Sequence, residues 1–241
     1  MTLSNNIKNK KDSWNYIWKK KSNQIKAKNI NDLLILNGWD ANLSKFSVKS
    51  WKNFVNYFIY KNKINKSHTI LEIGCGAGAF LLPFYKKNIK CYGIDNIINF
   101  IKICKNFMPE AKFYNAEANN LKIIEKIKFD FIFCHSIFQY FPSKKYAYQV
   151  LKEVLRFKTK ENKIYILDIP DNKKKKNYIS QLKKQIGKRK YKEKYSKNMH
   201  QFYNYEYFAK IVKKNNYKIE KLTKNLLNKK TSRYRFNIII Y

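Results

Sequence analysis

Residues 71–80 read LEIGCGAGAF, and this stretch decides the fold. Three of the six glycines in the chain, Gly74, Gly76 and Gly78, alternate within it. Apolar residues lead into the glycines and continue after them at helical spacing, which predicts a strand, a tight turn and then a helix. Such a turn can hold a small molecule, because glycine adopts positive φ and has no Cβ to block a ligand. The start of the following helix would add unpaired N–H groups.

The glycine stretch begins a repeated alternation of strands and helices. Strands are predicted at 69–73, 89–94, 112–115, 129–134 and 162–168, helices at 77–87, 96–107, 119–127, 143–157 and 204–214, and two last strands at 217–223 and 233–240. Repeated strand–helix units form a parallel sheet with helices on both faces. The sequence therefore predicts an α/β domain over residues 67–241.

Residues 1–66 are predicted to form a helical extension of this domain. All four tryptophans lie in the first 51 residues: Trp14, Trp18, Trp39 and Trp51. Apolar stripes predict one helix opened by Asp12 or Ser13 and a second starting near Ser47. Helices with so much aromatic surface are expected to dock on the main domain. Two interpretations stay open, a packing extension and a partial lid over a ligand.

The composition sets limits on the partners and the location of the protein. The formal charge is +36, yet only four of the 52 basic residues are arginine. Arginine is the preferred residue for contacts with phosphates and bases, so codon bias explains the charge better than nucleic-acid binding does. No apolar run reaches the length of a membrane span, and no signal peptide is visible, so a cytoplasmic protein is expected. The four cysteines lack metal-type spacing and read as buried thiols, with no metal site.

Acidic residues are few, and several fall at strand ends. Asp95 lies 21 residues beyond Gly74, where a carboxylate can accept both hydroxyls of a ribose. Glu117, or the amide of Ala118, can meet the edge of an adenine. Glu72 lies in the first strand, two residues before Gly74. This arrangement suits an adenosine cation better than a pyrophosphate.

From about Ile70 to Asp171, these motifs resemble a class I S-adenosylmethionine-dependent methyltransferase of the small methyltransferase-domain superfamily. The most specific motif is E-x-G-x-G-x-G, formed by Glu72, Gly74, Gly76 and Gly78. The resemblance implies a Rossmann-like three-layer sandwich, whose seven-stranded, mostly parallel sheet has a final antiparallel strand. It also implies S-adenosyl-L-methionine as cofactor.

The resemblance assigns roles within the donor site. The glycine turn wraps the methionine part, and the backbone of Gly74 takes its amino group. Asp95, with Asn96 beside it, takes the ribose, and Glu117 with Ala118 frames the adenine. His135 is placed next to the transferable methyl.

A nicotinamide dinucleotide enzyme is the main rival. Gly74, Gly76 and Ala79 also satisfy the pattern G-x-G-x-x-A, and Asp95 suits its ribose. The charge of Glu72 argues against it, because a dinucleotide strand is normally apolar there. The late start of the nucleotide fold and the final pair of strands also favour the methyl donor.

The predicted catalytic residues are His135 and Tyr140. The candidates for a general base are His135, which has the best position, Tyr140, Asp168 and His200, and Tyr140 is also expected to line the pocket or stack on the donor. The structural alternatives are that His135 only packs at a strand end and that Tyr140 is part of the core. The lysine-rich insert at 172–201 is expected to select the substrate. The resulting hypothesis is methyl transfer to oxygen or nitrogen of a small molecule or glycan precursor. An RNA methyltransferase using the basic surface and a donor-binding protein without turnover are the alternatives.

Overall fold

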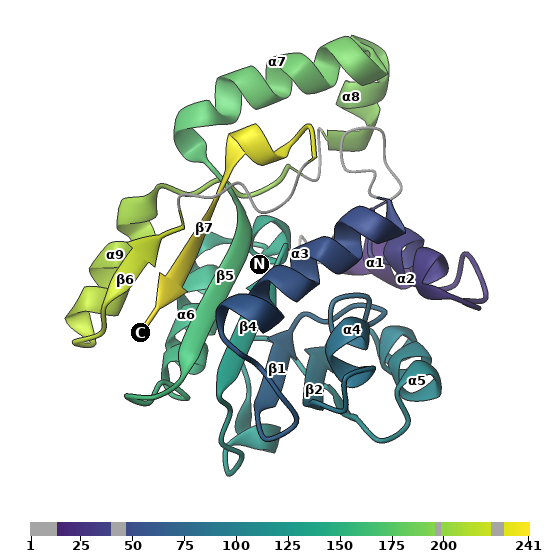
Figure 1. Ribbon diagram of the computed structural model, residues 1–241. Coiled ribbons are helices and arrows are strands. Elements are labelled where there is room, and N and C mark those ends of the chain that lie inside the picture. The colour runs from purple at the N-terminus through teal and green to yellow at the C-terminus, as the bar shows by residue number, and fades with distance from the viewer. Residues whose placement is uncertain (1–13, 40–46, 196–198, 223–228) are drawn as a thin grey trace, which may run out of the picture.

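The fold is centred on a sheet whose strands run in the order β3-β2-β1-β4-β5-β7-β6. The computed structural model describes residues 14–39, 47–195, 199–222 and 229–241 (Figure 1). Within these residues the strands are β1 (Thr69–Ile73), β2 (Lys90–Asp95), β3 (Lys112–Asn115), β4 (Phe131–His135), β5 (Lys163–Pro170), β6 (Ile219–Lys221) and β7 (Arg235–Ile240). β7 runs antiparallel to both β5 and β6, and the other neighbouring strands pair in parallel. The predicted fold class is confirmed.

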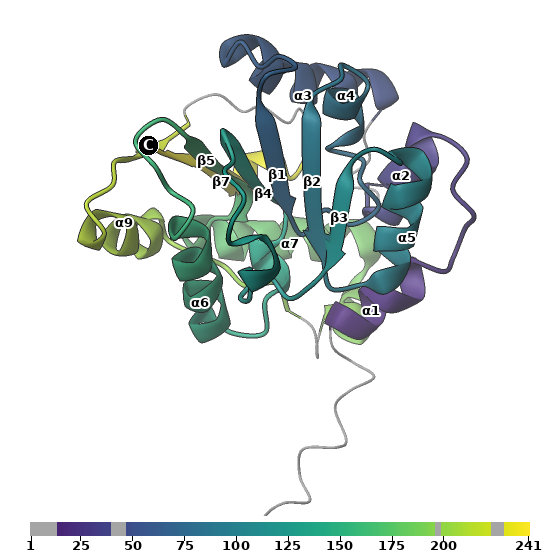
Figure 2. The ribbon, with the colours of Figure 1, turned by 90° about the horizontal axis from the view of Figure 1, so that it is seen from below.

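Helices cover both faces of the sheet, as the two views show (Figures 1 and 2). α3 (Val48–Lys61), α4 (Leu82–Tyr85) and α5 (Ile98–Phe107) share one apolar core with one face. α6 (Lys144–Leu155) and α9 (Tyr205–Lys214) share a second core with the other face. In the described part of the chain, none of the helices is long and apolar enough to cross a bilayer. The four cysteines are free and buried, as predicted.

Two predicted helices are mostly absent. The helix expected at 77–87 shrinks to the four residues of α4, and the one at 119–127 becomes a 3₁₀ turn, η2 (Lys122–Ile124). A continuous helix through Pro83 would leave the carbonyl of Ala79 without its i→i+4 donor, because proline has no N–H. Trp51 from α3 donates its indole Nε1–H to that carbonyl instead, at 2.8 Å. The glycine turn is therefore not followed directly by a helix N-terminus.

Residues 14–39 and 47–66, the described part of the N-terminal extension, contain the helices α1 (Trp14–Lys21), α2 (Ile30–Leu36) and α3. α3 starts next to Ser47, as predicted. Ser47 caps it, and its Oγ accepts a hydrogen bond from the Ser50 N–H at 3.1 Å. The predicted caps of α1, Asp12 and Ser13, lie outside the described residues. α2 was not predicted, although Asn29 and Asp32 form the reciprocal capping box that opens it.

The lysine-rich insert forms two helices, α7 (Lys175–Ile186) and α8 (Lys188–Tyr195). Gly187 separates them with φ of +83°. Tyr178 and Leu182 of α7 pack with Phe202 in a small cluster of their own. In Figure 2 the arrows of β1, β2 and β3 point toward the side of the molecule where α1 and α7 lie. The insert and the N-terminal helix therefore border the carboxyl ends of the parallel strands.

Candidate active site

A cavity of about 990 Å³ opens at the carboxyl ends of β1, β2 and β4. Its walls come from the glycine turn, the strand ends, η3 (Phe138–Tyr140), α1 and the end of the insert. Nine of the ten predicted site residues line it: Glu72, Gly74, Gly76, Asp95, Asn96, Glu117, Ala118, His135 and Tyr140. Parallel strands bring these residues together because their carboxyl ends meet at one edge of the sheet.

Residues larger than glycine do not fit at Gly74 and Gly76 in the glycine turn. Gly74 and Gly76 have φ of +73° and +52°, values that favour glycine. A Cβ on Gly74 would lie 2.4 Å from Cγ2 of Ile137, and one on Gly76 would lie 2.6 Å from Oδ1 of Asn37. Both glycines line the cavity.

Gly78 has a different role from the one predicted. It is absent from the cavity lining, and a Cβ there would lie 2.6 Å from Cε of Met108 and 3.0 Å from Sγ of Cys104. Its φ of +81° lets the turn pack against α5. Gly78 therefore shapes the turn from behind rather than facing a ligand.

Asp95 ends β2 and holds the glycine turn in place. The Gly76 N–H donates to its Oδ2 at 2.8 Å, and the Ile97 N–H donates to its Oδ1 at 2.9 Å. Burial raises the pKa of Asp95 to about 6, against the opposing effect of these two donors. The carboxylate keeps free lone pairs on the cavity side, since each oxygen can accept more than one hydrogen bond.

Glu72 carries an unsatisfied oxygen at the floor of the cavity. The residue is 2% exposed, and its Oε2 has no hydrogen-bond partner among the described residues. Burial, and then the nearby charge of Asp95, raises the pKa of Glu72 well above its usual value. A ligand cation would relieve both effects, so the site fits the ammonium and sulfonium charges of S-adenosylmethionine.

Glu117 stands at the opposite rim, after β3. It accepts hydrogen bonds from Nδ2 of Asn96 at 3.1 Å and from the hydroxyl of Tyr146 at 2.6 Å. Ala118 beside it also lines the cavity. Tyr146 comes from α6 and was not predicted, because nothing in its local sequence distinguishes it from other surface tyrosines.

Asn37 is a second residue that the sequence analysis missed. It follows α2, and its Oδ1 accepts the Ala77 N–H at 2.6 Å while its Nδ2 donates to the Cys75 carbonyl at 3.4 Å. Both partners belong to the glycine turn. The N-terminal extension therefore takes part directly in shaping the cavity, a contact between distant segments that no local motif announces.

His135 ends β4 inside an aromatic cage. Its ring stacks on Trp39 with centroids 5.3 Å apart and planes 9° apart, and it contacts Trp51, Phe54 and Phe80. Burial lowers the pKa of His135 to about 3, with Lys229 and Arg235 acting in the same direction and Asp168 opposing them. The imidazole is neutral at ordinary pH, and its buried Nε2 has no hydrogen-bond partner within the described part of the chain. The predicted role of general base, which suits a histidine with the ordinary pKa of about 6.5, therefore does not fit this environment.

Tyr140 lies under the N-terminal helix. Its ring centroid is 4.8 Å from that of Trp14 and 5.1 Å from that of Trp18, both in edge-on contacts. Burial raises the pKa of Tyr140 to about 12, so the phenol stays protonated. Trp14 and Trp18 also line the cavity, and Trp18 packs against the main core. α1 therefore packs on the main domain and forms part of the cavity wall, whereas a lid over a bound ligand stays a prediction.

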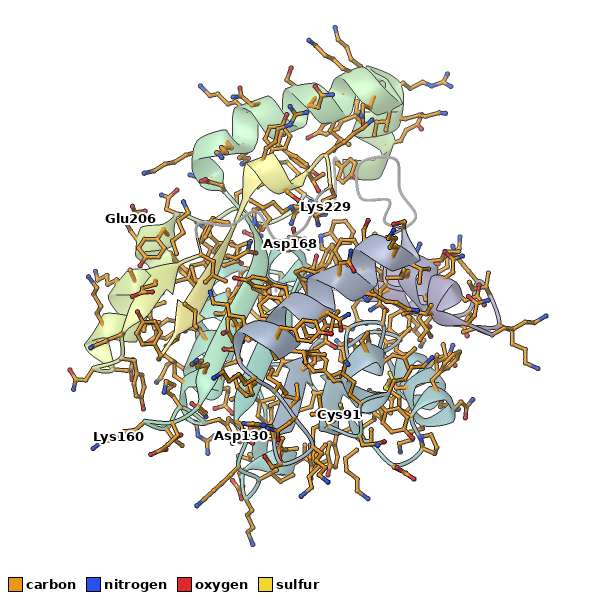
Figure 3. The ribbon with its side chains drawn as sticks, in the orientation of Figure 1. Cys91, Asp130, Lys160, Asp168, Glu206 and Lys229 are labelled. Carbon is orange, nitrogen blue, oxygen red and sulfur yellow. The ribbon has the colours of Figure 1, made fainter. Side chains whose placement is uncertain are left out.

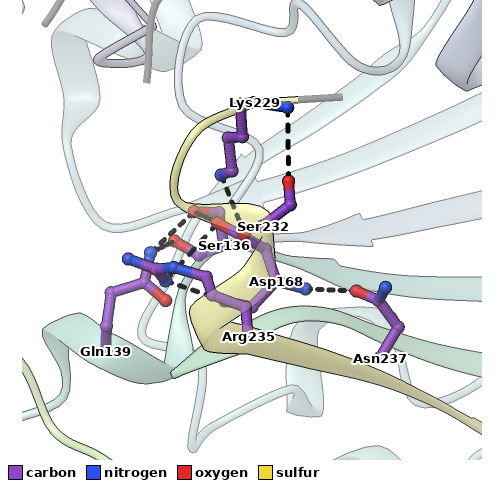
Figure 4. A network of polar contacts seen from close by, with 7 residues as sticks. All are labelled: Ser136, Gln139, Asp168, Lys229, Ser232, Arg235 and Asn237. Atoms are coloured by element: carbon purple, nitrogen blue, oxygen red, sulfur yellow. Dashed lines mark hydrogen bonds and ion pairs between the residues drawn. The ribbon is translucent and has the colours of Figure 1, made fainter. Parts of the chain in front are cut away.

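Behind His135 lies a buried polar cluster around Asp168, formed with Lys229, Arg235, Ser136 and Gln139 (Figure 4). Nζ of Lys229 lies 2.8 Å from Oδ1 of Asp168, and Nη1 of Arg235 lies 3.5 Å from Oδ2. Burial alone would raise the pKa of Asp168, but the two cations hold it at about 2. Asp168 is thus ion-paired and unsuited to the role of base. His200 is absent from the cavity lining and stacks on Trp14.

Two residues of this cluster, near the ends of the neighbouring strands β4 and β5, have an unusual backbone conformation. Asp168 and Ser136 have φ of +63° and +58°, in the left-handed region that non-glycine residues rarely adopt. The Ser136 hydroxyl donates to Oδ2 of Asp168 at 2.8 Å, and the pairing of β5 with β7 shifts register between Ile166 and Ile169. The register shift turns Asp168 toward the cluster. Such strain is typical of functional sites.

Comparisons with known proteins agree with this geometry. A family model described as a methyltransferase domain matches residues 64–230. A magnesium protoporphyrin IX methyltransferase from Synechocystis PCC 6803, solved with bound S-adenosylhomocysteine, superposes with a TM-score of 0.56 at 13% identity over 95% of this chain and 94% of that chain. An S-adenosylmethionine-dependent methyltransferase from Clostridium acetobutylicum ATCC 824 gives 0.60 at 15% identity over 86% of this chain and 96% of that chain.

A curated relative, a peramine synthetase from Metarhizium rileyi, is 24% identical over 99 residues, which make up 37% of this chain and 3% of the relative. The chain thus spans only a small part of that relative's length. The family model covers well over half of the chain and includes the glycine turn, Asp95 and His135. The chain belongs to the methyltransferase-domain family, and its fold is that of solved S-adenosylmethionine-dependent methyltransferases.

Proposed function

We propose that this enzyme transfers the methyl group of S-adenosyl-L-methionine to oxygen or nitrogen of a small molecule or glycan precursor. The observation that carries the proposal is the cover over the cavity. Trp14 and Trp18 of α1 pack on Tyr140 above it, and Met199 and Gln201 from the end of the insert complete the rim. A helix lying over the acceptor side suits a small acceptor better than a nucleic-acid strand.

In the proposed donor site, Glu72 faces the ammonium group, Asp95 accepts the ribose hydroxyls, and Glu117 with Ala118 lies along the adenine. The unpartnered oxygen of Glu72 and the hydrogen bonds of Asp95 to the glycine turn support these assignments. The donor brings an already activated methyl group, so the chain mainly aligns the acceptor and excludes water.

Proton removal is a small part of this mechanism. His135 is neutral with a pKa of about 3, Tyr140 stays protonated, and Asp168 is held by two cations. None of the three is a competent base near neutral pH. We infer that the acceptor supplies its own free lone pair, and that His135 and Tyr140 orient it.

The experiment is incubation of the protein with donor labelled in the methyl group and with host extract split into metabolites, glycans, protein and RNA. Label in the metabolite or glycan fraction is expected. Label in RNA, with binding that weakens steeply as salt rises, would support the alternative that uses the basic surface. Binding of S-adenosylhomocysteine with no label in any fraction would mean a donor-binding protein without turnover.

A further inference from the structure

The buried charges do not balance behind the part of the cavity lined by Trp39, His135 and Ser136, which we call the acceptor side. Asp168 faces both Lys229 and Arg235, and the three side chains are 2%, 2% and 8% exposed. Among the described residues, no other carboxylate forms an ion pair with either cation. Burial lowers the pKa of Lys229 to about 8, so Lys229 carries its proton below that pH. With His135 neutral beside it, the cluster then holds one unit of excess positive charge. A buried charge without a counter-ion is costly, so a ligand that brings one negative charge would be favoured.

This charge lies directly behind residues that line the cavity. Nζ of Lys229 is 4.3 Å from the ring centroid of Trp39, and Ser136 donates to Asp168; both Trp39 and Ser136 face the cavity. A ligand group resting on Ser136 and Trp39 is therefore one side chain away from the cations. Both cations are buried, so their field is only weakly screened. Figure 3 places Asp168 and Lys229 at the end of the sheet that faces α7, far from Asp130 at the other end.

The same region also holds unused hydrogen-bonding groups. Nε of Arg235 and Nε2 of His135 are buried and lack partners among the described residues. The Arg235 nitrogen is always a donor, and the His135 nitrogen can donate in one tautomer. Buried polar groups normally have partners, so their clustering beside an excess charge indicates a polar ligand group.

The residues that line the cavity indicate the shape and polarity of the rest of that ligand. Trp14, Trp18, Trp39 and Tyr140 all line the cavity, and they surround its acceptor side with aromatic faces and edges. Planar apolar ligands suit such walls, because rings stack or meet edge to face. The single excess charge matches a carboxylate better than a phosphate dianion.

Resting on the methyltransferase function proposed above, we propose that the acceptor is a planar aromatic acid whose carboxylate lies toward Ser136, His135 and the Lys229–Arg235 pair. The cations then select the acid, and the aromatic walls select its shape. Lys229 and Arg235 are specificity residues in this arrangement, since they act across the cavity wall and take no part in donor binding.

The first test uses protein saturated with S-adenosylhomocysteine, titrated at constant ionic strength with benzoate, benzamide and phenyl phosphate. The chain has four tryptophans, so the indole N–H signals in ¹⁵N NMR follow even millimolar binding. Benzoate is expected to bind at least tenfold more tightly than benzamide and no more weakly than phenyl phosphate. Equal binding of acid and amide, no binding of either, or tighter binding of the phosphate would overturn the proposal.

The second test removes the excess charge. Lys229→Met leaves the Asp168–Arg235 pair intact, so the preference for benzoate over benzamide should fall to near parity, and Lys229→Arg should restore it. Lys158→Met is the matched control, because Lys158 is also buried but precedes β5, at the opposite end of that strand from Asp168. It should keep the full preference.

Affinity for S-adenosylhomocysteine is measured for every variant. An undiminished preference in folded Lys229→Met, with donor affinity unchanged, would overturn the role of the cluster. Failure of the native protein to bind S-adenosylhomocysteine would instead count against the proposed methyltransferase function. The two proposals can thus fail separately.

Discussion

Asp95 holds the glycine turn and faces the cavity with the same carboxylate. Asp95→Ala removes the acceptors of two backbone N–H groups, so it should weaken binding of S-adenosylhomocysteine tenfold or more and also lower the melting temperature. Asp130→Ala is a suitable control, because Asp130 accepts the Thr69 N–H at 2.7 Å at the other end of the sheet. Calorimetry on that control should give native donor affinity; a similar loss there would show that the effect is general destabilisation.

The raised pKa of Asp95 also predicts a pH dependence. The ribose hydroxyls are better bound by the carboxylate than by the neutral acid, and the pKa in the free protein is about 6. Affinity for S-adenosylhomocysteine should therefore fall as the pH drops through that value, by up to tenfold per pH unit for Asp95. Protonation of Glu72, whose pKa burial also raises, acts in the same direction. Calorimetric titrations between pH 5 and 8 measure this. Affinity that is flat over the range would place the ribose away from Asp95.

His135 should not titrate in the physiological range. Its pKa of about 3 means that the imidazole remains neutral between pH 5 and 8. The ring signals of the three histidines can be followed by ¹³C NMR, and the signal lost in His135→Gln identifies His135. A shift of that signal with a midpoint near pH 6.5 would restore the case for a general base.

At the level of residues, the sequence was most informative for acids. Glu72, Asp95 and Glu117 stand out because carboxylates are few and these lie at the carboxyl ends of strands or just before a glycine turn. The place of His135 beside the methyl came from the family resemblance, and its charge state was not predicted. The cage that keeps it neutral is built by Trp39, Trp51 and Phe54, far away in sequence, and burial of that kind leaves no local pattern.

Among the elements, the glycine turn depends on the N-terminal extension. Gly76→Val should abolish donor binding, because its Cβ would meet the Asn37 amide and its φ of +52° disfavours a branched residue. The clash is with a side chain of the extension, whereas the sequence suggested a clash with the ligand. Calorimetry with S-adenosylhomocysteine tests this, with Gly187→Ala as control, since a Cβ at Gly187 meets nothing within 4 Å. A folded Gly76→Val protein that still binds normally would contradict this description of the turn.

The strands were predictable and some helices were not, for physical reasons. β1 is a short, mostly apolar and buried run, so it was predicted with its observed bounds. β3 was also predicted with its observed bounds, although it is an edge strand with only Phe113 buried. The helix after the glycines is cut short by Pro83 and by the Trp51 indole, a tertiary contact. The register shift that orients Asp168 depends on the pairing of β5 with β7, which single-strand patterns do not encode. The missed helix α2 did carry a readable signal, its capping box.

For the molecule as a whole, the Asp168 cluster joins β4, β5, β7 and the segment before β7 (Figure 4). Asp168→Asn would leave two buried cations without a counter-charge, which typically costs about 3–5 kcal/mol of the free energy of unfolding. Lys229→Met, which leaves a neutral pair, should cost clearly less. Unfolding in urea compares the two variants, and an equal loss in both would mean that the charge balance of the cluster is unimportant for stability.

The contact of Asn37 with Ala77 has a consequence for amide hydrogen exchange. The Ala77 N–H is donated to a side chain 40 positions earlier in the chain, so it becomes open to solvent deuterium when α2 moves away. The exchange rate at this one backbone position therefore measures how often the N-terminal extension undocks. Because the same turn faces the donor, a bound donor should slow that exchange. In Asn37→Ala the Ala77 N–H loses its acceptor, so its exchange rate should depend neither on docking of the extension nor on the donor. The extension and the donor would then protect one amide from opposite sides of the turn.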